Sequence, residues 1–307
     1  MTDCPLVSIV LVTYNDERFL PEYLARLDAT TYEPRELIVV DNGSTDATLE
    51  LLRARDHRLN LIENAPSVGF GAACNQAAEL AKGEFLVFMN ADVWVTPAWL
   101  AQLVTRMREH PDAGIVSPVT LPIYKGVEPA EQPYRDVAAV PGCSMMVRRS
   151  AWDELGGFEP HFFLTWEDTE LCWRARLAGW CVLEDLEAHV WHLGRGSWRR
   201  WAAEELHNGV YSHLKLMRWR RAVPFLGRSA VRTAVKLALL RDPSLLRVWS
   251  RVYRELPTAL RERRRWLQDA RRSQALERLV SAHTRRRRRE RVEEWYHGRR
   301  GSGLRAS

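Results

Sequence analysis

The chain has 307 residues, of which 46% are hydrophobic, so it is long enough to bury a sizeable core and too apolar to be a disordered protein. Its net charge of +6 is unevenly distributed. Residues 215–307 hold 27 of the 45 Lys and Arg residues but only 8 of the 39 Asp and Glu residues, so their net charge is +19. Residues 1–214 therefore have a net charge of −13. The five cysteines lack zinc-knuckle spacing, so we expect free thiols. The sequence has neither a signal-peptide pattern nor an apolar run of membrane-spanning length, so we expect a cytoplasmic protein.

Short apolar runs alternate with helical patterns through the first third of the chain. The run 7–12, VSIVLV, is continuous and β-branched, which is typical of a strand buried on both faces of a parallel sheet. The same reasoning predicts further strands at 37–40, 59–63, 85–89 and 114–117, and helices at 17–28, 45–54, 71–81 and 99–109. Strands that alternate with helices predict an α/β fold with right-handed crossovers.

The pattern changes in the second half of the chain. Segment 121–133 is rich in proline and is predicted to be irregular, and the apolar run 138–148 is strand-like with a break at Pro141 and Gly142. Segment 166–178 is predicted to be a helix, and the helical period returns beyond Trp198 and persists. We therefore expect an acidic α/β body over residues 1–213 and a basic helical region over residues 214–307.

Polar side chains follow three of the predicted strands. They are Thr13, Tyr14 and Asn15 after the first strand, Asp41 after the second, and Asn90 and Asp92 after the fourth. Ligands of parallel α/β sheets bind at the carboxyl ends of strands. An acid directly after a buried strand is costly without a partner, and a nucleotide base, a ribose or a metal ion would supply one. The alternative is that Asp41 only caps a turn and Asp92 only begins a loop.

Four motifs, in this order and spacing, resemble the signatures of family 2 inverting glycosyltransferases with the GT-A fold. They are VSIVLVTYN, LIVVDNGSTD, FLVFMNADV and WEDTELCWRARLAG. The resemblance covers residues 6–197. It implies a mostly parallel central sheet flanked by helices, with residues 1–213 as the catalytic domain and residues 214–307 as a basic helical extension.

The resemblance implies a site for a nucleoside diphosphate sugar. The positions that it assigns to the donor nucleotide are Thr13, Tyr14, Asn15, Asp41, Asn75, Asn90 and Gly142. Asp41 matches the acid that bonds the base, and Asn90 stands at the first position of an Asp-any-Asp signature. This departure removes one charge from the metal site and occurs in members that resemble rhamnosyltransferases. Gly142 would let the backbone approach a ligand, although an ordinary β-bulge is an alternative.

The resemblance also implies a divalent metal, Mg²⁺ or Mn²⁺, bound by Asp92 and His192. A leaving nucleoside diphosphate gains negative charge, which a divalent ion neutralises. The body is acidic, so a metal ion suits this role better there than a Lys and Arg cluster. The alternative for His192 is a packed or surface histidine, and we expect nearby His189 to be structural.

Trp166, Glu167 and Asp168 open a predicted helix after an aromatic-rich loop. By resemblance, Asp168 is the general base that deprotonates the acceptor hydroxyl, and Glu167 shapes the acceptor site. A carboxylate beside apolar rings tends to have a raised pKa and can take up a proton. The alternative is that Asp168 is a helix cap, which is a common use of Asp at this position.

The expected activity is therefore inverting transfer of a sugar, with rhamnose as the first choice, to a lipid-linked or cell-surface glycan acceptor. The form Asn90-Ala91-Asp92 and the histidine near the end of the body favour rhamnose. The alternatives are a hexosyl- or galactofuranosyltransferase of the same fold, and a nucleotide-sugar-binding protein without catalysis. Retention of Asp92, Asp168 and His192 together argues against the last.

The basic region mixes arginines with tryptophans at helical spacing, a composition that favours anionic membrane surfaces. We expect peripheral attachment to the inner face of the cell membrane. The alternative is a helical extension that packs on the body or on another subunit, which would make a homo-oligomer. The arginine run 285–289 could bind nucleic acid, but no stacking or groove-reading module accompanies it, so we do not expect nucleic acid as a partner.

Overall fold

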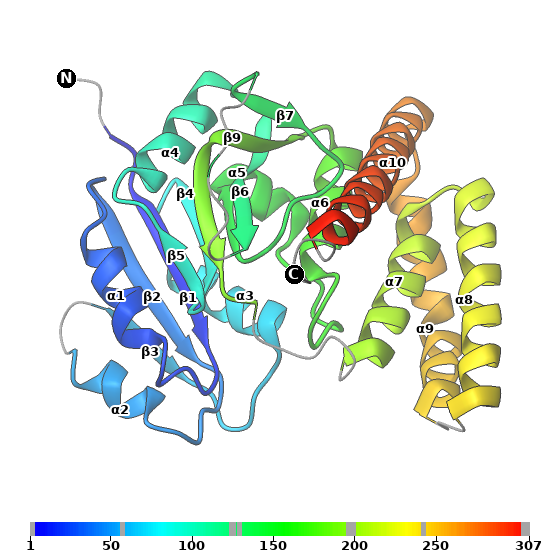
Figure 1. Cartoon of the computed structure of the whole chain (residues 1–307), viewed down its shortest axis with the longest axis horizontal. Coiled ribbons are helices and arrows are strands. Elements are labelled where there is room, and N and C mark those ends of the chain that lie inside the picture. The colour runs from blue at the N-terminus through cyan, green and yellow to red at the C-terminus, as the bar shows by residue number, and fades with distance from the viewer. Residues whose placement is uncertain are drawn as a thin grey trace, which may run out of the picture.

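The computed structural model describes residues 4–55, 59–122, 127, 131–194, 201–240 and 244–301. Within these residues, nine strands form one sheet in the order β3-β2-β1-β4-β8-β6-β9-β5, with β7 paired to β9 (Figure 1). The strands are β1 Val7–Thr13, β2 Arg35–Asp41, β3 Asn60–Glu63, β4 Phe85–Asn90, β5 Val93–Val95, β6 Ala113–Pro122, β7 Tyr134–Asp136, β8 Ser144–Arg148 and β9 Cys181–His192.

Helices cover both faces of this sheet. They are α1 Leu20–Asp28, α2 Thr48–Arg53, α3 Phe70–Leu80, α4 Trp99–Glu109, α5 Arg149–Leu155 and α6 Glu167–Ala178. Alternate residues of β1 point to opposite faces, as the pleat requires. Ile9 and Leu11 pack with α1 and α4, whereas Val10 and Val12 pack with α3 and α6. The continuous apolar strands of the sequence are thus buried on both sides.

The predicted α/β class is confirmed, with parallel pairing of β3, β2, β1 and β4. The parallel arrangement does not extend across the sheet, because β8 runs antiparallel to both β4 and β6, and β5 and β7 run antiparallel to β9. The predicted break at Pro141 and Gly142 is present, and β8 begins after it. Helix α5 was not predicted, and most of segment 121–133 lies outside the described residues.

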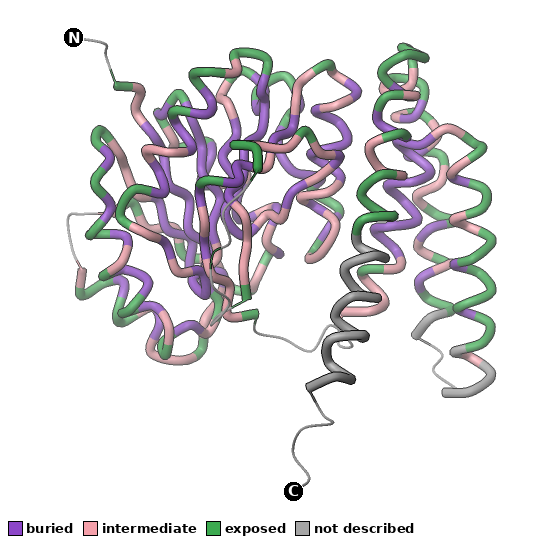
Figure 2. Tube along the Cα trace, turned by 45° about the horizontal axis from the view of Figure 1, so that its top comes forward, coloured by how far each residue is buried: buried purple, intermediate pink, exposed green. Residues whose placement is uncertain are grey.

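The basic region contains α8 Trp219–Leu240, α9 Ser244–Trp266 and α10 Ala270–Gly301, preceded by α7 Ala202–Leu216. The predicted boundary between residues 213 and 214 falls inside α7. Helix α9 packs along α7, and α10 packs against α6, so these helices share apolar clusters with the body. Exposed residues line the outer side of α8 (Figure 2). None of the helices among the described residues is long and apolar enough to span a membrane.

Candidate active site

The carboxyl ends of β1 and β2 form a polar corner. Thr13 and Asp41 are register partners at the two strand ends. The Thr13 hydroxyl donates to Oδ1 of Asp41 at 3.3 Å, and the Ser44 N–H donates to Oδ2 at 3.1 Å. The bond from Ser44 is the turn-capping contact that the sequence suggested as an alternative. Because a carboxylate has about four acceptor positions, these two bonds leave room for a ligand.

The residues after Thr13 connect two loops. Asn15 has a φ of 53°, a left-handed conformation that Asn tolerates better than most residues. Its N–H donates to Oγ of Ser44 at 3.0 Å, and its Oδ1 accepts from the Thr45 N–H at 2.7 Å. Tyr14 is 52% exposed. The corner therefore presents one exposed aromatic ring on a backbone that is fixed by its neighbours.

Asp92 and His192 are brought together by the pairing of β5 with β9. Val93 is the register partner of His192, and the Leu193 N–H donates to the Asp92 carbonyl at 2.9 Å. Nε2 of His192 lies 3.2 Å from Oδ1 of Asp92. The structure thus joins the two predicted metal ligands, which lie 100 residues apart in the sequence.

The donor set of this pair fits a divalent ion that a substrate helps to bind. No third His, Cys, Asp or Glu joins Asp92 and His192 to form a cluster within the described residues. Mg²⁺ is commonly bound through one or two protein carboxylates, with substrate phosphates and water at its other positions. Asn90 ends β4 two residues before Asp92, and its N–H donates to the Cys143 carbonyl at 3.3 Å.

Asp168 is fixed by two backbone N–H groups. Gly142 donates to Oδ2 at 2.9 Å, and Thr169 donates to Oδ1 at 2.5 Å. A Cβ at position 142 would lie 3.0 Å from Cβ of Asp168, which is tighter than most side-chain contacts. Glycine at position 142 therefore allows the turn to approach the carboxylate. Gly142 was predicted as a donor-binding residue, and the contact that the structure provides is with Asp168.

Cys143 lies between the two acidic sites. It is buried, and this burial raises the pKa of its thiol to about 12, with further contributions from the charges of Asp92 and Asp168. The Cys143 carbonyl accepts a hydrogen bond from the N–H of Asn90, two residues before Asp92, and the Gly142 N–H donates to Asp168. The Gly142–Cys143 turn therefore lies between the two acidic sites.

Glu167 and Asp168 differ in their surroundings although they are neighbours in α6. Burial raises the pKa of both carboxyl groups, and the Asp168 charge raises that of Glu167 further, to about 8. The N–H groups of Gly142 and Thr169 oppose the shift at Asp168. Oε2 of Glu167 is buried and has no hydrogen-bond partner among the described residues. A buried orphan oxygen of this kind indicates either a protonated group or a missing ligand.

The loop before α6 has a backbone that few side chains adopt. Thr165 has a φ of 71° and Trp166 a φ of 70°. Such conformations persist where surrounding contacts enforce them. Here the side-chain amide of Asn208 in α7 donates to the carbonyls of Leu164 and Thr165 at 3.0 and 2.9 Å, and the Trp166 ring packs edge-on to His213. Helix α7 thus fixes the start of α6.

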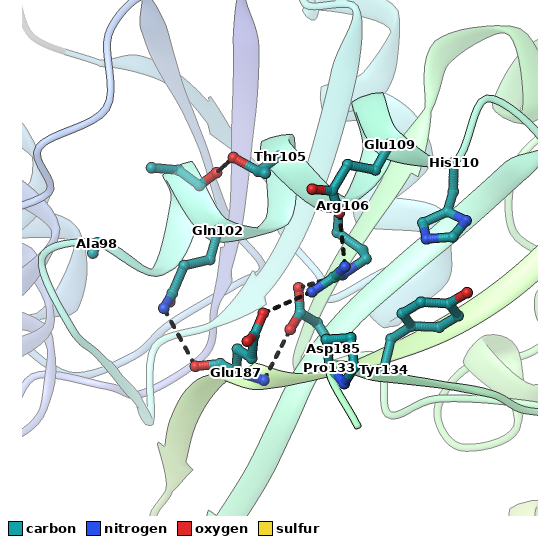
Figure 3. A pocket seen from close by; sticks show the side chains of 11 residues that line it. Ala98, Gln102, Thr105, Arg106, Glu109, His110, Pro133, Tyr134, Asp185 and Glu187 are labelled. Carbon is teal, nitrogen blue, oxygen red and sulfur yellow. Dashed lines mark hydrogen bonds and ion pairs between the residues drawn. The ribbon is translucent and has the colours of Figure 1, made fainter. Parts of the chain in front are cut away.

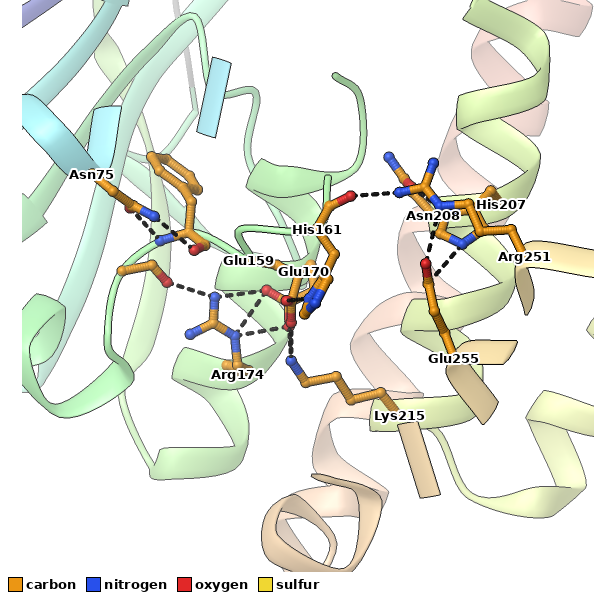
Figure 4. A network of polar contacts seen from close by, with 12 residues as sticks. Asn75, Glu159, His161, Glu170, Arg174, His207, Asn208, Lys215, Arg251 and Glu255 are labelled. Carbon is orange, nitrogen blue, oxygen red and sulfur yellow. Dashed lines mark hydrogen bonds and ion pairs between the residues drawn. The ribbon is translucent and has the colours of Figure 1, made fainter. Parts of the chain in front are cut away.

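A buried polar network joins the same loop to α6 and α7 (Figure 4). Lys215 contacts Glu159 at 2.5 Å and Glu170 at 2.9 Å, and Arg174 pairs with Glu170. Asn75 bonds the backbone of Phe158 with both ends of its amide, at 2.9 and 3.0 Å. Asn75 was predicted to touch the donor nucleotide, but its amide already bonds this loop.

A groove of about 670 Å³ lies elsewhere, between α4 and the first half of β9 (Figure 3). Arg106 spans it and pairs with Asp185, Glu187 and Glu109. Asp185 precedes His192 by seven residues, roughly 20 Å along a strand. The groove is therefore separate from the site of Asp92 and Asp168, and its one arginine is already paired with three carboxylates.

Residues 8–137 match the family model described as Glycosyl transferase family 2. This segment is a family 2 glycosyltransferase domain. It contains the polar corner, Asn90 and Asp92, and it ends before Gly142, Asp168 and His192. The matched segment is less than half of the chain.

Two curated glycosyltransferases are similar to the chain. An uncharacterized glycosyltransferase of Haemophilus influenzae is 34% identical over 113 residues, which cover 36% of this chain and 35% of that protein. The N-acetylglucosaminyl-diphospho-decaprenol L-rhamnosyltransferase of Mycobacterium tuberculosis is 28% identical over 265 residues, which cover 70% of this chain and 85% of that protein. The chain thus spans about a third of the length of the first relative and most of the second.

A solved glycosyltransferase shares the fold. The mannosyltransferase of Pyrobaculum calidifontis, in complex with GDP-Man and Mn²⁺, superposes with a TM-score of 0.58 at 20% identity, covering 89% of this chain and 88% of that one. The predicted GT-A fold is confirmed.

Proposed function

We propose that the protein transfers a sugar from a nucleoside diphosphate carrier to a hydroxyl group of an acceptor, with inversion at the anomeric carbon. The observation that carries this proposal is the arrangement of two acidic sites, Asp92 with His192 and Asp168, on either side of the Gly142–Cys143 turn. This arrangement suits a reaction in which one acidic site serves the leaving diphosphate and the other serves the attacking hydroxyl.

The polar corner is the proposed nucleotide site. Asp41 accepts from the base with its remaining lone pairs, and the exposed ring of Tyr14 supplies a flat apolar surface beside it. Thr13 and Asn15 hold the corner in shape through their bonds to Asp41 and to the loop after β2. Asn90 offers an amide to the ribose or to water.

Asp92 and His192 would hold a divalent metal ion, Mg²⁺ or Mn²⁺, against the donor diphosphate. When bound, the ion neutralises the negative charge that develops on the diphosphate as the glycosidic bond breaks. The mannosyltransferase solved with Mn²⁺ and GDP-Man supports this part of the proposal by its shared fold.

Asp168 is the proposed general base. Its carboxylate takes the proton from the acceptor hydroxyl, the hydroxyl oxygen forms a bond to the anomeric carbon, and the carbon–oxygen bond to the diphosphate breaks on the opposite side, so the configuration inverts. The N–H groups of Gly142 and Thr169 hold the carboxylate in position. Glu167, which its raised pKa leaves protonated at neutral pH, shapes the acceptor site.

Rhamnose is the sugar that we favour. The mycobacterial relative is named as a rhamnosyltransferase, and its alignment extends over most of its length. The acceptor that we propose is a lipid-linked or cell-surface glycan, as the name of that relative suggests by its decaprenol substrate. The enzyme would then act as a peripheral protein on the inner face of the cell membrane.

A panel of nucleoside diphosphate sugars tests the proposal. Each donor is incubated with protein and divalent metal, and slow release of nucleoside diphosphate is followed. A rhamnose donor should be hydrolysed fastest. Preference for a hexose or galactofuranose donor would favour the alternative transferases, and binding of donors without any hydrolysis or transfer would favour a binding protein.

A further inference from the structure

The outer face of α8 is apolar and exposed. Val223, Val231 and Val235 lie at intervals of eight and four residues, which places them along one side of the helix, and they are 59%, 64% and 50% exposed. The opposite side packs on the protein: Ala222 is fully buried, and Thr233 accepts a hydrogen bond from Nε1 of Trp249 in α9. The helix is therefore anchored on one side, while its valines meet solvent on the other.

The charges of α8 are all of one sign. Residues 219–240 contain Arg220, Arg221, Arg228, Arg232 and Lys236 and no Asp or Glu. Arg220 pairs with Glu277, and Arg221 donates to the Glu277 carbonyl, so these two hold α10. Arg228 and Arg232 are exposed and have no ion pair with a described residue.

The stripe of exposed valines is flanked by arginines without an ion pair among the described residues, and the helix is too polar to cross a bilayer. These are the features of a helix that lies in a membrane interface. We propose that the outer face of α8, formed by Val223, Val231, Val235, Arg228 and Arg232, docks the protein on an anionic lipid surface. The arginines complement acidic headgroups, and the valines enter the boundary of the acyl chains. A second protein copy would bring the same positive charges together and is disfavoured.

Helix α8 is connected to the candidate active site by contacts of its inner side. Phe225 of α8 stacks on His213 of α7 with ring centroids 3.5 Å apart and an interplanar angle of 8°. His213 contacts Trp166, the N-cap residue of α6 immediately before Glu167 and Asp168. The biological role of this surface rests on the proposed function, because docking on a membrane would bring Asp168 close to a lipid-linked acceptor.

Co-sedimentation with phosphatidylglycerol vesicles tests the proposal, with phosphatidylcholine vesicles as the neutral comparison. The wild-type protein should bind the anionic vesicles, and less so as the salt concentration rises. Val231→Glu with Val235→Glu should abolish binding without loss of thermal stability, since both side chains are exposed. Leu51→Glu with Leu80→Glu, which adds the same charges to exposed positions of the body, should leave binding unchanged.

A second pair of variants measures the electrostatic part. Each arginine near an anionic surface contributes about fivefold to the binding constant, so Arg228→Ala with Arg232→Ala should weaken binding about 25-fold. Arg26→Ala with Arg53→Ala on the body is the matched control and should have no effect. Wild-type protein that ignores anionic vesicles, or α8 variants that bind as well as wild type, would overturn the proposal.

Two further readouts separate the alternatives. Sedimentation velocity measures the oligomeric state. If the wild type is a dimer that binds no vesicles, and Val231→Glu with Val235→Glu makes it a monomer, the face binds a second copy and the proposal is overturned. Release of nucleoside diphosphate from a soluble donor, without vesicles, should be equal in the wild type and the α8 variants. If no donor is turned over while vesicle binding follows the expected pattern, the proposed function fails and the docking face stands.

Discussion

The backbone N–H of Gly142 lies 2.9 Å from Oδ2 of Asp168 and donates a hydrogen bond to it. The turn that separates the two acidic sites thus also orients the proposed base. Gly142→Ala would bring a methyl group to 3.0 Å from Cβ of Asp168, so the carboxylate must shift by a few tenths of an ångström. We expect turnover to fall about tenfold, because catalysis is sensitive to displacements of this size. Donor affinity, measured by calorimetry, should stay within about twofold. Unchanged turnover would mean that this contact does not position the base.

Asp168→Asn retains the shape of the side chain but cannot accept the proton. Turnover should fall by about 10²–10⁴-fold, the usual contribution of a general base. Glu167→Gln should reduce turnover less, because Glu167 does not accept a proton in the proposed reaction. Both variants should bind the donor as the wild type does. The opposite ranking of the two variants would exchange the roles of the two carboxyl groups.

Burial, and then the Asp168 charge, raise the pKa of Glu167 from 4.5 to about 8. Between these values the folded protein holds a proton that the unfolded chain has released, so the free energy of unfolding decreases as the pH rises through this window. Glu167→Gln removes the effect. The melting temperature of the variant should exceed that of the wild type at about pH 9 and match it near pH 4. A variant that is less stable than the wild type at about pH 9 would show that the fold stabilises ionised Glu167, and thus that its pKa is not raised.

Lys215 is 3% exposed and forms ion pairs with two buried carboxylates, Glu159 and Glu170. Burial would lower its pKa, but the two glutamates outweigh this effect and raise it. Lys215→Met leaves buried charge without its partner and should cost about 3 kcal/mol or more in the free energy of unfolding, measured by urea denaturation. Lys82→Met, at an exposed position, is the control and should cost less than about 0.5 kcal/mol. An equal effect of both substitutions would contradict the account of the network.

Asp92→Ala removes one of the two proposed metal ligands at a strand end, outside the apolar core. The variant should fold normally, bind Mn²⁺ at least tenfold more weakly and lose transfer, because the diphosphate leaves without its counter-ion. His192→Ala should weaken Mn²⁺ binding in the same direction. Chelation of the wild type by EDTA should reproduce the loss. Full activity in EDTA would remove the metal from the mechanism.

The sequence was sufficient for features that local patterns encode. The buried strands β1, β2 and β4 follow from continuous apolar runs, and the polar residues at their ends meet at one edge because parallel strands share a direction. The pairing of Asp92 with His192 followed only from resemblance. Strand β9 mixes acidic and apolar residues, and its pairing with β5 depends on residues about 100 positions apart.

Other features depend on tertiary contacts that no local pattern indicates. Lys215 was counted with the basic tail, although burial against Glu159 and Glu170 makes it part of the core. Asn75 was assigned to the donor, but a loop more than 80 residues away uses its amide. The basic composition of residues 214–307 similarly gave no sign that Arg263 is buried and bonds the carbonyl of Leu214. Polar residues of this kind can be placed only when their partners are known.

The measurement that tests the central claim most directly is the anomeric configuration of the product. The best donor of the nucleoside diphosphate sugar panel is incubated with protein and Mg²⁺, and the sugar that is released or transferred is followed by proton NMR before it can mutarotate. A single displacement assisted by Asp168 predicts a first-formed product of inverted configuration, with Asp168→Asn slowing its appearance by about 10²–10⁴-fold. A product that retains the donor configuration, or no turnover of any nucleoside diphosphate sugar, would contradict it.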